Sequence, residues 1–98
     1  MARKTSRKSV PLRLEGALDI QNAAAHHVTL SGWLAQPEPI FALDLSAVTD
    51  CDSAGLQLLC AARRSVLSAG HTWRPVHPSE PVLRACSEVA IKPEELGL

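Results

Sequence analysis

Hydrophobic and polar side chains alternate with a period of two near the start of the chain, which is the pattern of a half-buried strand. Over residues 10–15 every second residue is valine or leucine, and the residues between them are polar or proline. Because Pro11 has no N–H to donate to a neighbouring strand, it favours a sheet edge or a strand start. We expect Gly16 to end this strand.

A helix is predicted over about residues 21–35, where apolar residues recur with an imperfect helical period. Asp19 and Asn22 are both candidate N-caps, because their side-chain oxygens can accept hydrogen bonds from the first turn. Proline cannot continue a helix, so residues 36–39 should form a connection. The expected apolar positions of this helix are Ala23, Ala24, Val28, Leu30, Trp33 and Leu34.

The next part of the chain repeats the order of strand and helix. Residues 40–45 form an almost continuous apolar run, which is typical of a central strand covered on both faces. A turn is expected over residues 46–52. Apolar residues at three- and four-residue steps then predict a helix over about 53–69. Gly70 follows at the position where a helix commonly ends in left-handed backbone.

A short strand over residues 71–76 and a helix over about 82–89, with Ser79 as a candidate cap, complete the pattern. Three alternating strand–helix pairs predict an α/β domain with helices packed on a largely parallel sheet. We expect a single domain over residues 10–98. Residues 1–9 are expected to be a basic flexible arm or an edge strand.

Composition narrows the class of protein. A chain of 98 residues with 46% hydrophobic residues suits one small globular domain. Its ten basic and ten acidic residues cancel, but four basic residues lie in the first eight, so residues 9–98 carry a charge of −4. This balance argues against a nucleic-acid binder, because four charges in the arm would give only weak, salt-sensitive contacts with nucleic acid or anionic lipid.

The sequence gives little support for a membrane-spanning segment or a metal-binding site. No run approaches the ~18 apolar residues that would cross a bilayer, so we expect no direct membrane insertion. The three cysteines are widely spaced and lack a C-x-x-C pair, which disfavours a disulfide framework or zinc site and favours a cytoplasmic location. Adjacent His26 and His27 would point about 100° apart on a helix and could not chelate one metal ion. No motif predicts a cofactor or an enzyme.

The loop before the helix at 53 is the most informative segment. Asp50 and Asp52 lie there, and Ser53 stands at the expected helix start. Either Asp52 or Ser53 could serve as a helix cap. Alternatively, the partial positive charge of the helix N-terminus would tolerate a phosphate on Ser53. That phosphate would add about −1.5 to −2 charges beside two carboxylates and change what can dock. Both interpretations are open at this point.

Three other side chains have plainer interpretations. Cys51 stands beside two acidic residues, so its thiol pKa should be raised and its reactivity low. Trp33 and Trp73 are expected to pack in the core rather than stack on nucleic-acid bases.

The segment LDLSAVTDCDSAGLQLL, followed by a helix ending in Ala-Gly and a strand, resembles the STAS domain of bacterial anti-sigma factor antagonists. The upstream LEGALDIQNA, residues 14–23, resembles the strand, turn and helix that open the same domain. The resemblance covers roughly residues 10–90. It implies a small mixed, largely parallel sheet covered mainly on one face by helices, and a function in partner switching rather than catalysis.

The resemblance also implies a site. In this family the unphosphorylated antagonist binds a serine-kinase anti-sigma factor and frees the sigma factor for transcription. The kinase phosphorylates the serine after an aspartate, which ends the interaction, and a metal-dependent phosphatase resets it. On this chain Ser53 becomes the phosphoacceptor. The candidate partner-binding residues are Asp19, Asp50, Asp52, Ala54 and Gly55, the last two because small side chains leave the site open.

The chain departs from the family pattern in three places. Its first predicted helix is rich in alanine and carries His26 and His27, Ala54 stands where a second hydroxyl or a glycine is common, and the C-terminal tail is short. These departures concern the partner more than the fold. Two other partners therefore stay open. The chain could be a constitutive STAS subunit on the ATPase of a bacterial lipid-transport ABC complex, with no phosphate needed, or a STAS protein of a chemosensory cluster.

Overall fold

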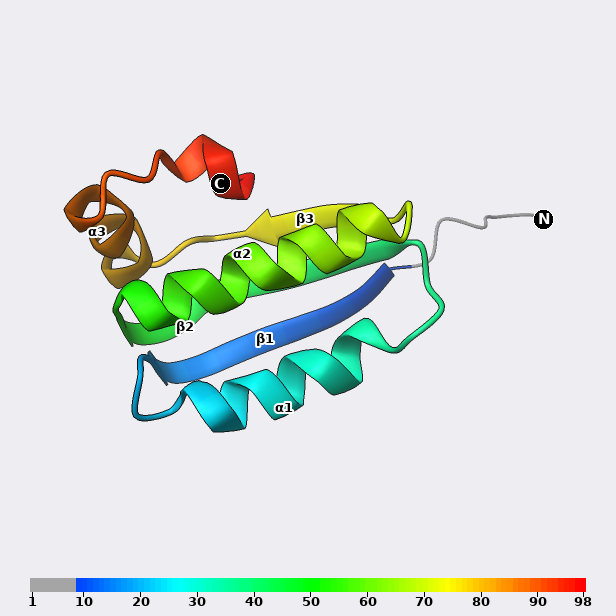
Figure 1. Ribbon diagram of the computed structural model, residues 1–98, viewed down its shortest axis with the longest axis horizontal. Coiled ribbons are helices and arrows are strands. Elements are labelled where there is room, and N and C mark those ends of the chain that lie inside the picture. The colour runs from blue at the N-terminus through cyan, green and yellow to red at the C-terminus, as the bar shows by residue number, and fades with distance from the viewer. Residues whose placement is uncertain (1–8) are drawn as a thin grey trace.

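The computed structural model describes residues 9–98 (Figure 1). The predicted order of three strand–helix pairs is confirmed, and a short 3-10 helix, η1, follows it. The basic segment predicted as an arm or edge strand lies outside the described residues, except for Ser9, which begins β1. The elements are β1 (Ser9–Leu18), α1 (Ala23–Leu34), β2 (Ile40–Cys51), α2 (Ser53–Ser68), β3 (Thr72–Val76), α3 (Glu80–Glu88) and η1 (Pro93–Leu96).

The sheet has three parallel strands in the order β1-β2-β3. Successive crossovers of the same hand between neighbouring parallel strands place their helices on one face. α1 and α2 accordingly pack against each other along the sheet, while α3 lies near the end of β2 (Figure 1). The expected largely parallel sheet with helices mainly on one face is thus confirmed, and both strand pairings within residues 9–98 are parallel. Of the helices in residues 9–98, none combines the length and the apolar character that a membrane crossing requires.

The core lies between β2 and the helices. Phe41, Leu43 and Leu45 are buried, whereas Ala42 and Asp44 between them are only partly buried. β2 is therefore central, as predicted, but the expectation that both its faces would be covered is wrong. The alternation shows that its helix-facing side carries most of the apolar burial.

Both tryptophans contribute to packing, as predicted. The Trp33 ring meets the Phe41 ring edge-on at a centroid distance of 5.2 Å. Its Nε1–H donates to the Val10 carbonyl at 2.8 Å, which ties α1 to β1. Half-buried Trp73 donates to the Leu96 carbonyl at 2.7 Å and so holds η1 against β3.

Both long strands run further than predicted. β1 continues through Gly16, whose φ of +81° is open to glycine without strain, and ends at Leu18. The expected turn over residues 46–52 is wrong, because β2 continues to Cys51. Two register shifts against β1 each add one residue to β2. They move its inward positions to three-residue steps after Leu45, which hides the period of two.

The helix boundaries and caps also differ in detail. α1 begins at Ala23, and Asn22 at its N-cap makes no side-chain cap bond. Asp19 instead accepts hydrogen bonds from the Asn22 backbone and side chain at 3.0 and 2.8 Å, which stabilises the turn before α1. Val28 was expected to be an apolar packing position of α1 but is 72% exposed.

The ends of the later elements follow the same pattern of small differences. α2 begins at Ser53 and ends at Ser68, and Gly70 has the expected left-handed backbone at φ +79°. β3 begins at Thr72 and α3 at Glu80. Ser79 occupies the α3 N-cap but makes no cap bond, and its buried Oγ has no hydrogen-bond partner among the described residues.

Candidate docking site at the start of α2

The structure decides which residue caps α2. Asp52 has extended backbone at the N-cap, and its Oδ1 accepts a hydrogen bond from the Gly55 N–H at 3.1 Å. Ser53 is the first helical residue and is exposed, and its hydroxyl makes no hydrogen bond within residues 9–98. The Ser53 side chain is therefore not used to hold the fold together.

Asp52 also ties α2 to the loop between β1 and α1. Its Oδ2 accepts a hydrogen bond from the Ile20 N–H at 3.0 Å, and its own N–H donates to the Leu18 carbonyl at 3.2 Å. The Ile20 N–H, followed by that of Gly55, holds the pKa of the Asp52 carboxyl below its usual value. Hydrogen bonds to a charged form favour that form, so Asp52 is held as a carboxylate.

Gly55 is buried and required by packing. A Cβ at this position would lie 2.1 Å from the Leu18 carbonyl oxygen and 2.8 Å from the Leu18 Cγ. The absence of a side chain lets α2 approach the end of β1 closely. Gly55 thus shapes the candidate site from beneath, whereas its neighbour Ala54 is partly exposed.

The three predicted acidic residues come together around Cys51. Asp50 is exposed and accepts a hydrogen bond from the Cys51 N–H at 2.9 Å, and Asp19 is partly exposed. Burial raises the pKa of the Cys51 thiol to about 12, with further contributions from Asp52, Cys86, Asp50 and Asp19. The predicted rise in the thiol pKa is confirmed, but burial is its largest cause and the three carboxylates contribute less.

Ile20 belongs to this surface but was not among the residues singled out from the sequence. It is 69% exposed although its side chain is apolar, and its backbone N–H is bonded to Asp52. An isoleucine between Asp19 and Asn22, inside a turn that has no periodic pattern, is the signal that could have identified it. The candidate site therefore combines an exposed serine, three carboxylates and one apolar side chain.

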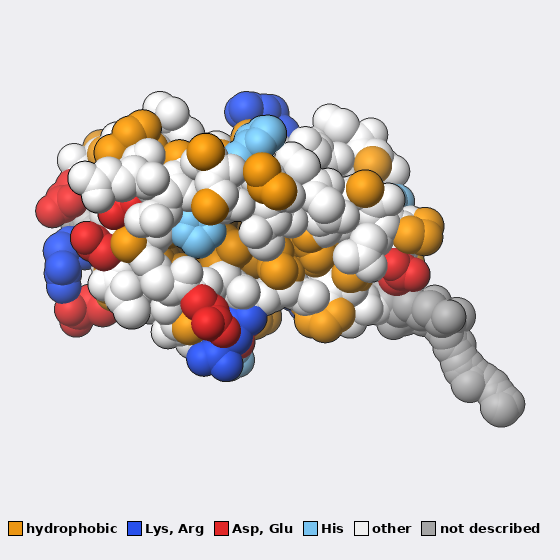
Figure 2. Space-filling view, turned by 90° about the horizontal axis from the view of Figure 1, so that it is seen from below, with side chains coloured by type: hydrophobic (Ala, Val, Ile, Leu, Met, Phe, Trp, Pro, Cys, Tyr) orange, Lys and Arg blue, Asp and Glu red, His pale blue; other side chains and the backbone are white. Residues whose placement is uncertain are grey.

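The surface of α1 is largely neutral. No charged residue occurs in its twelve positions. In the view from below, lysine, arginine, aspartate and glutamate side chains lie mostly toward the margins of the molecule (Figure 2). The acidic candidate site is thus set against a neutral neighbouring helix.

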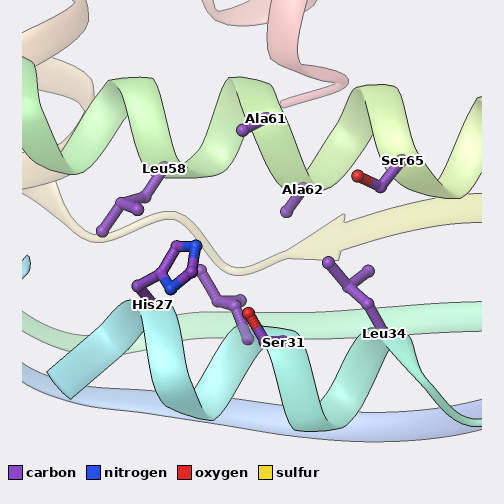
Figure 3. A pocket seen from close by; sticks show the side chains of 8 residues that line it. His27, Ser31, Leu34, Leu58, Ala61, Ala62 and Ser65 are labelled. Carbon is purple, nitrogen blue, oxygen red and sulfur yellow. The ribbon is translucent and has the colours of Figure 1, made fainter. Parts of the chain in front are cut away.

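The two adjacent histidines take different positions. His26 Nε2 lies 2.8 Å from the Ala17 carbonyl oxygen, and exposed His27 lines a shallow groove between α1 and α2 (Figure 3). Within residues 9–98 no three potential metal ligands form a group. The other residues lining the groove are Leu30, Ser31, Leu34, Leu58, Ala61, Ala62 and Ser65.

Comparison with known proteins places this geometry in a family. The structure of the anti-sigma factor antagonist SpoIIAA in its unphosphorylated form shares the fold, with a TM-score of 0.66, 19% identity, and coverage of 95% of this chain and 88% of that one. A Thermotoga maritima protein described as a candidate anti-sigma factor antagonist gives a TM-score of 0.71 and 27% identity, over 89% of this chain and 75% of that one. No curated protein sequence matches the chain. The family model described as "Mlab, STAS domain" matches residues 1–90, and the chain therefore belongs to this family of STAS domains.

Proposed function

We propose that this chain is a protein-binding module that docks a partner through the start of α2 and is switched by phosphorylation of Ser53. The observation that carries the proposal is that Asp52 and Ser53, although adjacent, have different roles in the structure. Asp52 caps the helix, and Ser53 is exposed with a hydroxyl that the fold does not use. A modification of Ser53 can therefore change the surface without first breaking a bond that stabilises the domain.

The switch needs a partner kinase and ATP. The Ser53 Oγ forms a bond to the γ-phosphorus as the bond from that phosphorus to the bridging oxygen of ADP breaks, and the hydroxyl proton passes to a base of the kinase. A phosphatase would return the hydroxyl by hydrolysis. The serine-kinase anti-sigma factor implied by the resemblance supplies the first of these activities, so no catalytic group is required of this chain.

Phosphorylation should end docking because of desolvation. The phosphate would carry about −1.5 to −2 charges and would have to be buried when a partner covers the surface. A buried charge is costly unless it is paired, and the neighbours Asp50 and Asp52 are themselves acidic. The unmodified surface avoids this cost and offers the exposed Ile20 side chain for contact.

Intact mass spectrometry tests the proposal most directly. Protein isolated from its native cells should contain a fraction heavier by one phosphoryl group, and phosphatase treatment should remove that fraction. It should be absent from Ser53→Ala and present in the matched control Ser68→Ala, which removes an exposed serine at the other end of α2. A phosphoryl group that persists in Ser53→Ala would contradict the assignment.

The constitutive subunit of a lipid-transport ABC complex is the second candidate. The observation in its favour is the description of the family model, which names Mlab rather than the antagonists, so family membership alone does not require a switch. Stable co-purification of an ATPase with protein that is never phosphorylated, and equally with Ser53→Ala, would select this candidate.

A further inference from the structure

One carboxylate joins the two segments that form the docking surface. Asp52 accepts from the first turn of α2 through Oδ1, at 3.1 Å from the Gly55 nitrogen. It accepts from the loop before α1 through Oδ2, at 3.0 Å from the Ile20 nitrogen, 32 positions away in the sequence. Within residues 9–98 the Ile20 N–H has no other acceptor, and the Ile20 side chain is too exposed for packing to hold it.

We propose that Asp52 couples Ser53 to Ile20, so that a phosphate on Ser53 loosens the Asp52–Ile20 hydrogen bond and releases the loop that presents Ile20. This inference rests on the proposed function for its role, because it describes how the same docking surface would be regulated. It assigns the phosphate a second effect besides its own charge. The apolar contact that the exposed Ile20 side chain offers to a partner would be lost at the same time.

The physical reason is competition for donors beside a like charge. A phosphate at the first position of α2 brings three strong acceptor oxygens to the N–H groups of the first turn, where Asp52 now accepts from Gly55. It also brings negative charge next to a carboxylate whose low pKa depends on the Ile20 and Gly55 N–H groups. Both effects weaken the carboxylate's hold on its two partners. Gly55 lies within α2, whereas the Ile20 N–H has only the Asp52 carboxylate as its acceptor among the described residues.

Amide hydrogen exchange measured by NMR tests this coupling on the isolated protein. Phosphoserine is installed at position 53 during translation, so the experiment does not depend on a kinase. Exchange of the Ile20 amide should rise by about tenfold, the effect of losing one hydrogen bond. The amides of buried Leu30 and Trp33 in α1 should keep their rates, which would separate loop release from general destabilisation.

Two variants identify the residue that transmits the effect. In Asp52→Ala, Ile20 exchange should already be fast, and phosphoserine at 53 should add nothing to it. In the matched control Asp50→Ala, which removes a nearby carboxylate that has no bond to the loop, phosphoserine should act as in the wild type. If Asp52→Ala does not fold, Asp52→Asn, which keeps one acceptor without the charge, should show a reduced response.

The coupling is wrong if phosphoserine leaves Ile20 exchange unchanged in the wild type, or if the same rise occurs in Asp52→Ala. Neither result would bear on whether Ser53 is phosphorylated in cells, which intact mass decides separately. Conversely, the coupling could be observed in a protein that no kinase modifies, and it would then be a property of the surface without a use as a switch.

Discussion

At the scale of a single residue, the contact between Gly55 and Leu18 gives the sharpest prediction. Gly55→Ala would place a Cβ 2.1 Å from a backbone carbonyl that cannot move cheaply. We expect the free energy of unfolding to fall by at least ~2 kcal/mol in urea titration. Gly32→Ala is the matched control, since nothing lies within 4 Å of its added Cβ, and alanine in a helix should stabilise by ~0.5–1 kcal/mol. Equal stability of Gly55→Ala and the wild type would contradict the packing argument.

Two residues of the site show what could be predicted from the sequence and what could not. The importance of the Asp52–Ser53 pair could be predicted, because capping residues stand before an apolar helical pattern. Which of the two acts as the cap could not, because both side chains can accept from the first turn. Ile20 was missed for a different reason. Its backbone N–H is bonded to Asp52, 32 positions away, and no local pattern in the sequence indicates that contact.

At the scale of elements, the sequence pattern located the three strands and three α-helices of residues 9–98 but not their ends, and it did not indicate η1. The predicted strand ends at residue 45, too early for β2, because two extra residues in β2 relative to β1 break the alternation after Leu45. In α1 the apolar residues surround the helix without a clear buried face, so Val28 could not be distinguished from buried Leu30 by spacing. In both cases pairing and packing with other elements, rather than local preference, decide the outcome.

The attachment of α1 to β1 gives a prediction at this scale. Trp33→Phe keeps an aromatic ring near Phe41 but removes the donor to the buried Val10 carbonyl. We expect a loss of ~1–3 kcal/mol in unfolding free energy, because the carbonyl is left without a partner. Trp73→Phe makes the same chemical change at a half-buried ring and leaves the carbonyl of buried Leu96 without its donor, so we expect a loss of similar size. Calorimetry of the two variants measures both losses, and an unchanged unfolding free energy in either variant would contradict this account.

For the whole molecule, two carboxyl groups predict how stability falls in acid. Hydrogen bonds from Ser46 lower the pKa of Asp44, and those from Ile20 and Gly55 lower that of Asp52. Groups with a lowered folded pKa contribute stability above the unfolded pKa, about 3.9, and lose it as pH falls through the folded values. Unfolding free energy should therefore decline below about pH 4. Asp44→Asn and Asp52→Asn should each flatten this decline.

The alkaline part of the same stability profile depends on a group whose pKa is raised, rather than lowered, in the folded protein. Burial raises the pKa of the folded Cys51 thiol from 9.0 to about 12, so the unfolded chain loses its proton first as pH rises. The contribution of the thiol is fully present below pH 9 and is lost between about pH 9 and 12. Urea titrations across this range, under reducing conditions, should show a decline in unfolding free energy that Cys51→Ala reduces, since burial also raises the pKa of the Cys86 thiol. An unchanged slope in Cys51→Ala would show that other groups govern the alkaline part of the stability profile.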